Sequence, residues 1–309
     1  MRIAVLIPCY NEEAAIAQTV AGFQAALPEA TVYVYDNNSK DRTIAIAKAA
    51  GAVVRREPLQ GKGHVVRRMF ADIEADIYVM ADGDATYHAP SAPAMIAKLV
   101  DENLDMVVGT RLHSDEALAF RAGHHFGNRL LTGFVAWLFG DRFQDMLSGY
   151  RVFSRRFVKS FPALAKGFET ETELAVHALS LDMPVAEVET PYYARPAGST
   201  SKLRTYRDGW RILLTILSLL KEERPLFFFG WLGVGLLALA FLLAVPILGT
   251  YFETGLVPRF PTAILATGIV ILAFLAFTAG LVLDTVTYGR REAKRMAYLA
   301  HPAPGATRS

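Results

Sequence analysis

Cysteine is almost absent from this chain of 309 residues, and so is net charge. Cys9 is the only cysteine, which excludes an internal disulfide and agrees with folding in a reducing compartment. The formal charge at pH 7 is +2, so overall electrostatics favour no particular partner, and we expect no nucleic-acid partner. No internal repeat is visible, which argues against a repeat protein.

The glycine motifs of two common nucleotide-binding loops are also missing. The turn Gly61-Lys62-Gly63 has neither the P-loop spacing nor the GxGxxG fingerprint of a dinucleotide-binding fold. A soluble Rossmann oxidoreductase is therefore a poor candidate.

Long apolar runs are confined to the C-terminal third of the chain. Residues 226–248 and about 262–283 carry no charge, and each exceeds the ~20 residues needed to cross the hydrocarbon core of a membrane. The sequence therefore predicts two transmembrane helices. The alternative is a pair of buried helices in a soluble protein.

Flanking charge predicts the orientation of these helices. The connecting loop, residues 249–261, contains one basic residue, Arg259, whereas the outer flanks contain Lys221, Arg224, Arg290, Arg291, Lys294 and Arg295. By the positive-inside rule both termini are cytoplasmic. The apolar run at residues 3–7 stops at Pro8 and is too short for a signal peptide. We therefore expect a multi-pass protein of the inner (plasma) membrane whose soluble domain is cytoplasmic.

The first part of the chain alternates short apolar strands with amphipathic helices. Strands are predicted at 3–7, 31–35, 52–55, 77–81 and 106–109, and helices at 13–27, 43–50 and 64–71. This alternation is typical of βαβ units around a mostly parallel sheet. Such sheets bind ligands beyond the carboxyl ends of their strands.

The segment Asp82-Gly83-Asp84 directly follows the apolar strand 77–81. Hard cations such as Mg²⁺ or Mn²⁺ are typically held by one or two carboxylates together with substrate phosphates. The segment therefore indicates a metal ion and a nucleotide, although an ordinary polar turn after a strand would look the same.

Three further loops follow predicted strands at the same edge. Residues 8–13 offer an aromatic ring and hydrogen-bonding groups for a base, and Asp36 at the tip of its strand could accept from ribose or base. Residues 36–43 also resemble a common helix-capping loop. Gly61-Lys62-Gly63 precedes a helix, where backbone amides, a lysine and the helix dipole suit a phosphate.

Six motifs of this chain occur in a characteristic order. They are Pro8-Cys9-Tyr10-Asn11-Glu12, Asp36 to Thr43, Gly61-Lys62-Gly63, Asp82-Gly83-Asp84, Gly109-Thr110-Arg111 and Asp145 to Arg151. The set resembles family 2 glycosyltransferases, and most of all their dolichol- or polyprenyl-phosphate sugar synthases, over about residues 1–220. The two predicted spans are similar to the small membrane anchor of that branch.

The resemblance implies an α/β fold of the GT-A type, a Rossmann-like and mostly parallel sheet followed by a transmembrane hairpin. It implies a catalytic domain at 1–200 and a basic amphipathic segment at 201–224. Two transmembrane helices within 225–289 and a cytoplasmic tail at 290–309 follow.

The resemblance also assigns roles to residues. The nucleotide would be held by Pro8, Tyr10, Asn11, Glu12, Asp36, Asn38, Lys62, Asp82 and Gly83, and the metal, Mg²⁺ or Mn²⁺, by Asp84 and Asp82. The donor or acceptor phosphates would meet Arg111, Arg129, Ser148, Arg151, Arg195 and Lys202, the last two in a mobile loop. Asp145 stands where the family keeps its catalytic carboxylate. Among the acids of residues 168–174, which we expect to begin a helix, one glutamate could also touch substrate.

The implied enzyme is a metal-dependent, inverting glycosyltransferase that moves one sugar from a UDP- or GDP-type donor to a lipid. Transfer of a single sugar is favoured because Gln-x-x-Arg-Trp, found in processive polysaccharide synthases, is missing and two spans cannot form a translocation channel. Arginines near the acceptor side favour a polyprenyl phosphate over a hydroxyl lipid such as diacylglycerol or ceramide. A non-catalytic nucleotide-sugar-binding membrane partner is the competing class, and a homo-oligomer is compatible with the sequence.

Overall fold

The structure, a computed structural model, describes residues 1–113, 133, 137, 143, 145–165, 167, 169–196, 214 and 217–305. The chain divides into two compact units. The first comprises Met1–Trp210 together with Ala293–Ser309, and the second comprises Arg211–Glu292.

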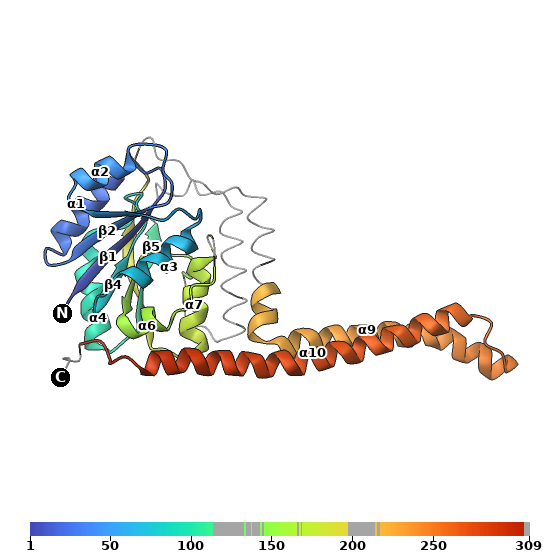
Figure 1. The fold of residues 1–309 in the computed structure, drawn as a ribbon. Helices are drawn as coiled ribbons and strands as arrows, with labels where there is room; N and C mark the ends of the chain where they lie inside the picture. Colours follow the sequence, from blue (N-terminus) through green and yellow to red (C-terminus); the bar gives the residue numbers. More distant parts are fainter. Residues whose placement is uncertain are drawn as a thin grey trace. The chain divides into compact units, whose positions relative to one another are not determined.

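The first unit is built on a seven-stranded sheet with the order β3-β2-β1-β4-β6-β5-β7 (Figure 1). Its strands are β1 (Ile3–Cys9), β2 (Thr31–Asp36), β3 (Val53–Arg56), β4 (Ile77–Met80), β5 (Met106–His113), β6 (Arg151–Ser154) and β7 (Val185–Tyr192). All neighbouring strands pair in parallel except β6, which runs antiparallel to both β4 and β5. The fold is thus the mostly parallel α/β sheet that the sequence predicts.

Helices cover both faces of this sheet (Figure 1). They are α1 (Ile16–Ala26), α2 (Thr43–Ala49), α3 (Lys62–Asp72), the 3-10 helix η1 (Ala89–Ser91), α4 (Ala92–Asp101), α6 (Arg155–Ser160) and α7 (Thr170–Ser180). Side chains of α1, α2 and α4 form one buried core with alternate residues of the strands. On the other face, Phe70 of α3 contacts Tyr78 and Phe153 edge to face, and Phe157 of α6 stacks on Phe153.

The direction of the strands determines where the site lies. Because β6 is antiparallel to both of its neighbours, β5 runs in the same direction as β4, and β7 runs parallel to β5. The carboxyl ends of β1, β2, β4, β5 and β7 therefore meet at one edge of the sheet. The segment 145–150 enters β6 at that same edge.

The predicted elements are close to the observed ones. Each of the five predicted strands overlaps an observed strand, and α1, α2 and α3 begin within three residues of the predicted helices. The helix expected to begin within residues 168–174 is α7. No strands were predicted at residues 151–154 and 185–192, which form β6 and β7.

The second unit contains most of two long helices, α9 (Pro225–Thr254) and α10 (Phe260–Leu299). Both are long and apolar enough to cross a membrane, and the predicted spans lie within them. Small residues bring the two helices close, since a Cβ added at Gly233 of α9 would lie 2.8 Å from the ring of Phe277 of α10. A closely packed apolar pair of this kind suggests a membrane anchor.

Candidate active site

The loops after β1 and β2 are tied to each other by side-chain hydrogen bonds. The backbone N–H of Asn11 donates to Ser39 Oγ at 2.8 Å, and the Lys40 N–H donates to Asn11 Oδ1 at 2.8 Å. The N–H of Glu12, a buried residue, donates to Thr43 Oγ1 at 2.9 Å. Asn11 has a φ of 54°, in the left-handed region that asparagine tolerates better than most residues. Asn11 and Glu12 thus form the frame of the predicted nucleotide site.

Four other predicted nucleotide-binding residues lie at or beside the ends of these strands. Pro8 is buried in β1, and Tyr10, half-buried, immediately follows that strand. Asp36 is fully buried at the end of β2, where its carboxylate accepts from the Ser39 N–H at 3.2 Å. Asn38 donates to the Pro58 carbonyl at 2.8 Å. The predicted residues of both loops therefore come together at one edge.

Asn37, which was not predicted as a site residue, connects this edge to Gly61-Lys62-Gly63, the turn predicted to meet a phosphate. Its side chain donates to the carbonyls of Glu57 and Leu59 at 3.0 and 2.7 Å, and its Oδ1 accepts from the Gly61 N–H at 2.7 Å. These bonds fix the start of α3 and with it the position of Lys62. Nothing in the sequence separated Asn37 from the other polar residues of its turn.

Lys62 lies between two carboxylates. Its ammonium is 2.5 Å from Asp82 Oδ1 and also contacts Glu171 Oε1 in the first turn of α7. Burial alone lowers the pKa of Lys62, but the charges of Asp82 and Glu171 outweigh it and hold the pKa above its usual value. Lys62 is therefore a fixed positive charge at the site, and Glu171 is the glutamate of residues 168–174 that reaches it.

The two acids of Asp82-Gly83-Asp84 have different surroundings. The Asp82 side chain is 32% exposed, whereas that of Asp84 is 6% exposed. Asp84 Oδ1 accepts from Thr86 Oγ1 at 2.7 Å, and Asp84 Oδ2 lies 2.9 Å from a guanidinium nitrogen of Arg195. Burial, and then the charge of Asp82, raise the pKa of Asp84.

Two glycines allow the backbone of this site to close up. A Cβ added at Gly83 would lie 2.4 Å from Cys9 Sγ, and one added at Gly149 would lie 2.7 Å from Asp82 Oδ2. A side chain at position 83 would therefore collide with Cys9, and one at position 149 would displace the Asp82 carboxylate.

A divalent cation fits the donors present here. Asp82 and Asp84 supply carboxylates from one turn, and Mg²⁺ or Mn²⁺ needs only one or two when phosphates complete its coordination. Within the described part of the chain no group of three or more His, Cys, Asp and Glu side chains could hold a metal without such help. Asp82 and Asp84 are therefore the carboxylates of this edge that would hold such a cation.

Arg111, near the end of β5, forms a bidentate ion pair with Asp145. Its Nε and one terminal nitrogen lie 2.7 Å from the two Asp145 oxygens. The guanidinium also lies 5.7 Å from the centre of the Tyr192 ring. Burial lowers the pKa of Arg111, but the hydrogen bonds to Asp145 and the neighbouring charges hold it above its usual value. Both oxygens of the predicted catalytic carboxylate thus already accept hydrogen bonds.

Ser148 and Arg151 were predicted to meet phosphates, but both are fully buried. Ser148 Oγ donates to the Gly109 carbonyl at 2.6 Å, and Arg151 donates to the carbonyls of Met146 and Ser148. Burial lowers the pKa of Arg151. The structure brings neither side chain to the open edge; both instead hold the loop that carries Asp145. The predicted phosphate ligands Arg129 and Lys202 lie outside the described residues.

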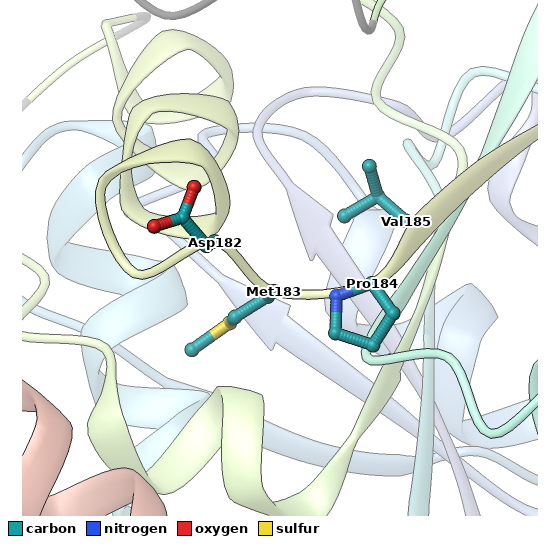
Figure 2. Close-up of a pocket in the computed structure, with 4 residues that line it drawn as sticks. All are labelled: Asp182, Met183, Pro184 and Val185. Carbon is teal, nitrogen blue, oxygen red and sulfur yellow. The ribbon is translucent and has the colours of Figure 1, made fainter.

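A separate hollow of about 340 Å³ is lined by Asp182, Met183, Pro184 and Val185 (Figure 2). These residues lead from α7 into the beginning of β7. Because the carboxyl end of β7 belongs to the edge with Asp84 and Arg111, the hollow is at the opposite edge and takes no part in the site.

Comparison with known proteins agrees with this geometry. The family model described as glycosyl transferase family 2 matches residues 4–160. The glycosyltransferase AglJ of Haloferax volcanii is 37% identical over 232 residues, 75% of this chain and 76% of that protein. A dolichyl-phosphate hexose transferase of the same organism is 29% identical over 223 residues, covering 72% and 95% of the two chains.

The structural comparison gives the same fold. The glucosyl-3-phosphoglycerate synthase of Mycobacterium tuberculosis, solved with Mn²⁺, UDP and glucosyl-3-phosphoglycerate, aligns with a TM-score of 0.57 and 25% identity. The alignment covers 70% of this chain and 79% of that enzyme. With the family model spanning about half the chain and AglJ matching three quarters of it, this protein belongs to the family 2 glycosyltransferases, with a GT-A catalytic fold.

Proposed function

We propose that this protein transfers a single sugar, with inversion and with the help of a divalent cation, from a nucleoside diphosphate sugar to a polyprenyl phosphate. The observation that carries the choice of acceptor is the Arg111–Asp145 pair. A phosphate acceptor is already ionised near neutral pH and needs no general base, whereas a hydroxyl acceptor does. A carboxylate whose two oxygens accept from one guanidinium is better suited to orienting an arginine than to removing a proton.

The relatives support both substrates of this proposal. One is named a dolichyl-phosphate hexose transferase, and the solved neighbour contains UDP and Mn²⁺. The apolar helices α9 and α10 supply a membrane anchor. This anchor would keep the first unit (Met1–Trp210 with Ala293–Ser309), called the catalytic unit below, near a lipid acceptor. We assign the catalytic unit to the cytoplasmic face of the plasma membrane, following the basic residues that flank the two helices.

Different residues of the chain would bind the donor, orient the acceptor and stabilise the leaving group. The loops that end β1 and β2 hold the base and ribose, and Lys62 brings positive charge to the diphosphate side. Arg111, oriented by Asp145, attracts the acceptor phosphate, whose oxygen attacks the anomeric carbon in one displacement. A cation bound at Asp82 and Asp84 would stabilise the negative charge that grows on the leaving nucleoside diphosphate.

A panel of donors and acceptors tests this proposal. UDP- and GDP-sugars should be combined with polyprenyl phosphate, diacylglycerol and ceramide in detergent, and glycolipid formation measured with and without chelator. Transfer to polyprenyl phosphate that requires Mg²⁺ or Mn²⁺ is the expected result. Transfer only to a hydroxyl lipid would overturn the acceptor, and nucleotide binding without transfer would favour a non-catalytic partner.

The variant Asp145→Asn separates the two kinds of acceptor. With a hydroxyl acceptor the loss of a general base should cost about 10²- to 10⁴-fold in rate and remove the acidic limb of the pH profile. With a phosphate acceptor the acidic limb should persist, because the second ionisation of the acceptor remains, and the KM for the lipid should rise as Arg111 loses its orientation. A lost acidic limb with unchanged KM would contradict the proposed role of Asp145.

A further inference from the structure

Asp84 has a positively charged partner from a distant part of the sequence. Arg195 follows the last residues of β7, and its guanidinium lies 2.9 Å from Asp84 Oδ2. The other oxygen of Asp84 accepts from the hydroxyl and the N–H of Thr86, at 2.7 and 3.3 Å. Both oxygens of this carboxylate are therefore engaged by the chain itself.

A buried carboxylate beside a second carboxylate needs a compensating charge. Asp84 is buried, and Asp82 stands two residues away in the same turn. Asp82 has its own cation, Lys62, which is only 12% exposed and is also held by Glu171. Asp84 forms its ion pair with Arg195, whose side chain is 32% exposed.

The two cations differ in how far they can move. Lys62, at the start of α3, is held by two carboxylates, so any movement of its ammonium would break two ion pairs. Arg195 lies beyond the end of a strand and is partly open to solvent, so it can leave Asp84 without unfolding an element. A cation that uses Asp84 Oδ2 as a ligand must displace the Arg195 guanidinium from that atom.

We propose, in an inference that rests on the proposed function, that Arg195 is the internal counter-ion of Asp84. When the divalent cation binds Asp84 it displaces the Arg195 guanidinium, which then pairs with the donor diphosphate. A guanidinium pairs well with phosphate oxygens. The metal alone then binds weakly, because it must separate Arg195 from Asp84 with no anion to receive the arginine. A nucleoside diphosphate supplies that anion, so nucleotide and metal strengthen the binding of each other.

This exchange predicts that one substitution at Arg195 strengthens the binding of Mn²⁺ alone and weakens the binding of the nucleotide. In Arg195→Gln, Mn²⁺ alone should bind about tenfold more tightly than in the wild type, because the competing charge is gone. UDP or GDP in the presence of Mn²⁺ should bind more weakly, because the diphosphate has lost a partner. The factor by which nucleotide tightens Mn²⁺ binding, expected at about 5- to 150-fold in the wild type, should fall toward one.

The experiment measures Mn²⁺ binding to the full-length protein in detergent by electron paramagnetic resonance, with and without UDP or GDP. Arg195→Lys keeps the charge and should retain most of the competition. Arg68→Gln is the matched control: it removes an arginine that pairs with Asp72 on α3, and it should leave Mn²⁺ binding unchanged. Thermal melting of each variant establishes that it is folded.

Three results would overturn the exchange. They are unchanged or weaker binding of Mn²⁺ alone in Arg195→Gln, an equal gain in Arg68→Gln, and a wild type that binds no Mn²⁺ with either nucleotide. Sugar transfer is measured separately with the donor and acceptor panel. An active enzyme with no exchange rejects this inference alone, whereas exchange in a protein without transfer activity rejects only the proposed reaction.

Discussion

Asp82 and Asp84 are two residues apart, yet their surroundings give them different tasks. Asp82 is partly exposed and shares Lys62 with Glu171, whereas Asp84 is buried against Thr86 and Arg195. Loss of the charge at Asp84 should therefore abolish binding of the divalent metal ion, whereas loss of the charge at Asp82 should chiefly disturb the position of Lys62.

We predict that Asp84→Asn lowers metal-dependent sugar transfer by on the order of 10²-fold or more, as expected when a main electrostatic stabiliser is lost. Burial raises the pKa of Asp84, so its ionised form is disfavoured by the fold and a neutral amide should leave the melting temperature nearly unchanged. Initial rates at several Mn²⁺ concentrations, together with a thermal melt, provide the measurement.

Asp82→Asn is the matched comparison, because the same atoms change two residues away. It should raise the donor KM through Lys62 while keeping a response to added Mn²⁺. Equal loss of activity and of Mn²⁺ response in both variants would mean that Asp82 and Asp84 contribute equally to metal binding.

At the residue scale the sequence predicted which loops form the site better than it predicted what each side chain does. Asp36, Lys62, Asp82 and Asp84 follow or flank strands that local periodicity reveals, so their meeting at one edge could be expected. The engagement of Lys62 by Glu171 joins residues 109 positions apart (171 − 62), and no local pattern encodes it. The inward direction of Arg151 likewise depends on the packing around β6.

Among the elements, α7 connects the active site to the interior. Its first turn carries Glu171, and near its end His177 is buried against the rings of Phe157 and Phe161. The imidazole shares a hydrogen bond of 3.0 Å with Ser160 Oγ. Burial, and then the charge of Lys294, lower the pKa of His177 from 6.5 to about 3, so the folded protein keeps it neutral.

This neutral histidine predicts a pH dependence of stability. Well above pH 6.5 the group is neutral in both the folded and the unfolded state. As the pH falls from 6.5 toward 3, the unfolded chain binds a proton that the folded chain does not. The free energy of unfolding should then fall by up to ~1.4 kcal/mol per pH unit from this group alone. In His177→Phe this contribution should disappear, which denaturant titrations between pH 4 and pH 7 would measure.

Ser160→Ala provides the control, because it removes the hydroxyl partner of His177 but keeps the buried imidazole. Its stability should be lower at every pH, with the wild-type slope retained. If His177→Phe keeps the wild-type slope, another group is responsible for it.

The elements that the sequence revealed are the ones with local signals. Apolar strands bounded by turns and helices with regular apolar spacing were recovered for the first five strands. β6 is only four residues long, and β7 mixes Glu187 and Glu189 with apolar residues at the edge of the sheet, so neither shows a clear period. Their assignment depends on pairing with β4 and β5.

At the scale of the whole molecule, α10 continues beyond its apolar part and ends within the catalytic unit. The sequence predicts a cytoplasmic tail at residues 290–309, and residues 293–309 group with residues 1–210 in one compact unit. The Tyr298 hydroxyl donates to Asp105 Oδ2 at 2.9 Å, and the Arg156 guanidinium lies 4.8 Å from the centre of the Tyr298 ring. Burial and the charge of Asp105 raise the pKa of Tyr298 to about 12, so this hydroxyl remains a donor.

These contacts predict that the catalytic unit loses stability without the end of α10. Asp105, directly before β5, is fully buried and keeps Ser154 and Arg156 as partners when the Tyr298 hydroxyl is removed. Tyr298→Phe should therefore cost about 1.5–3 kcal/mol, the range for a hydrogen bond to a charged group. Truncation after residue 292 should cost more, because the ring over Arg156 is lost as well.

Thermal melts in detergent, with nucleotide binding recorded in parallel, would measure both effects. Tyr288→Phe is the matched control, since Tyr288 is 63% exposed on the same helix and its hydroxyl should contribute little to stability. A protein truncated after residue 224 should still bind nucleotide, because every strand of the sheet precedes that point, but it should melt at the lower temperature of the chain truncated after 292. Equal melting temperatures for the full-length and shortened proteins would show that the end of α10 merely rests on the catalytic unit.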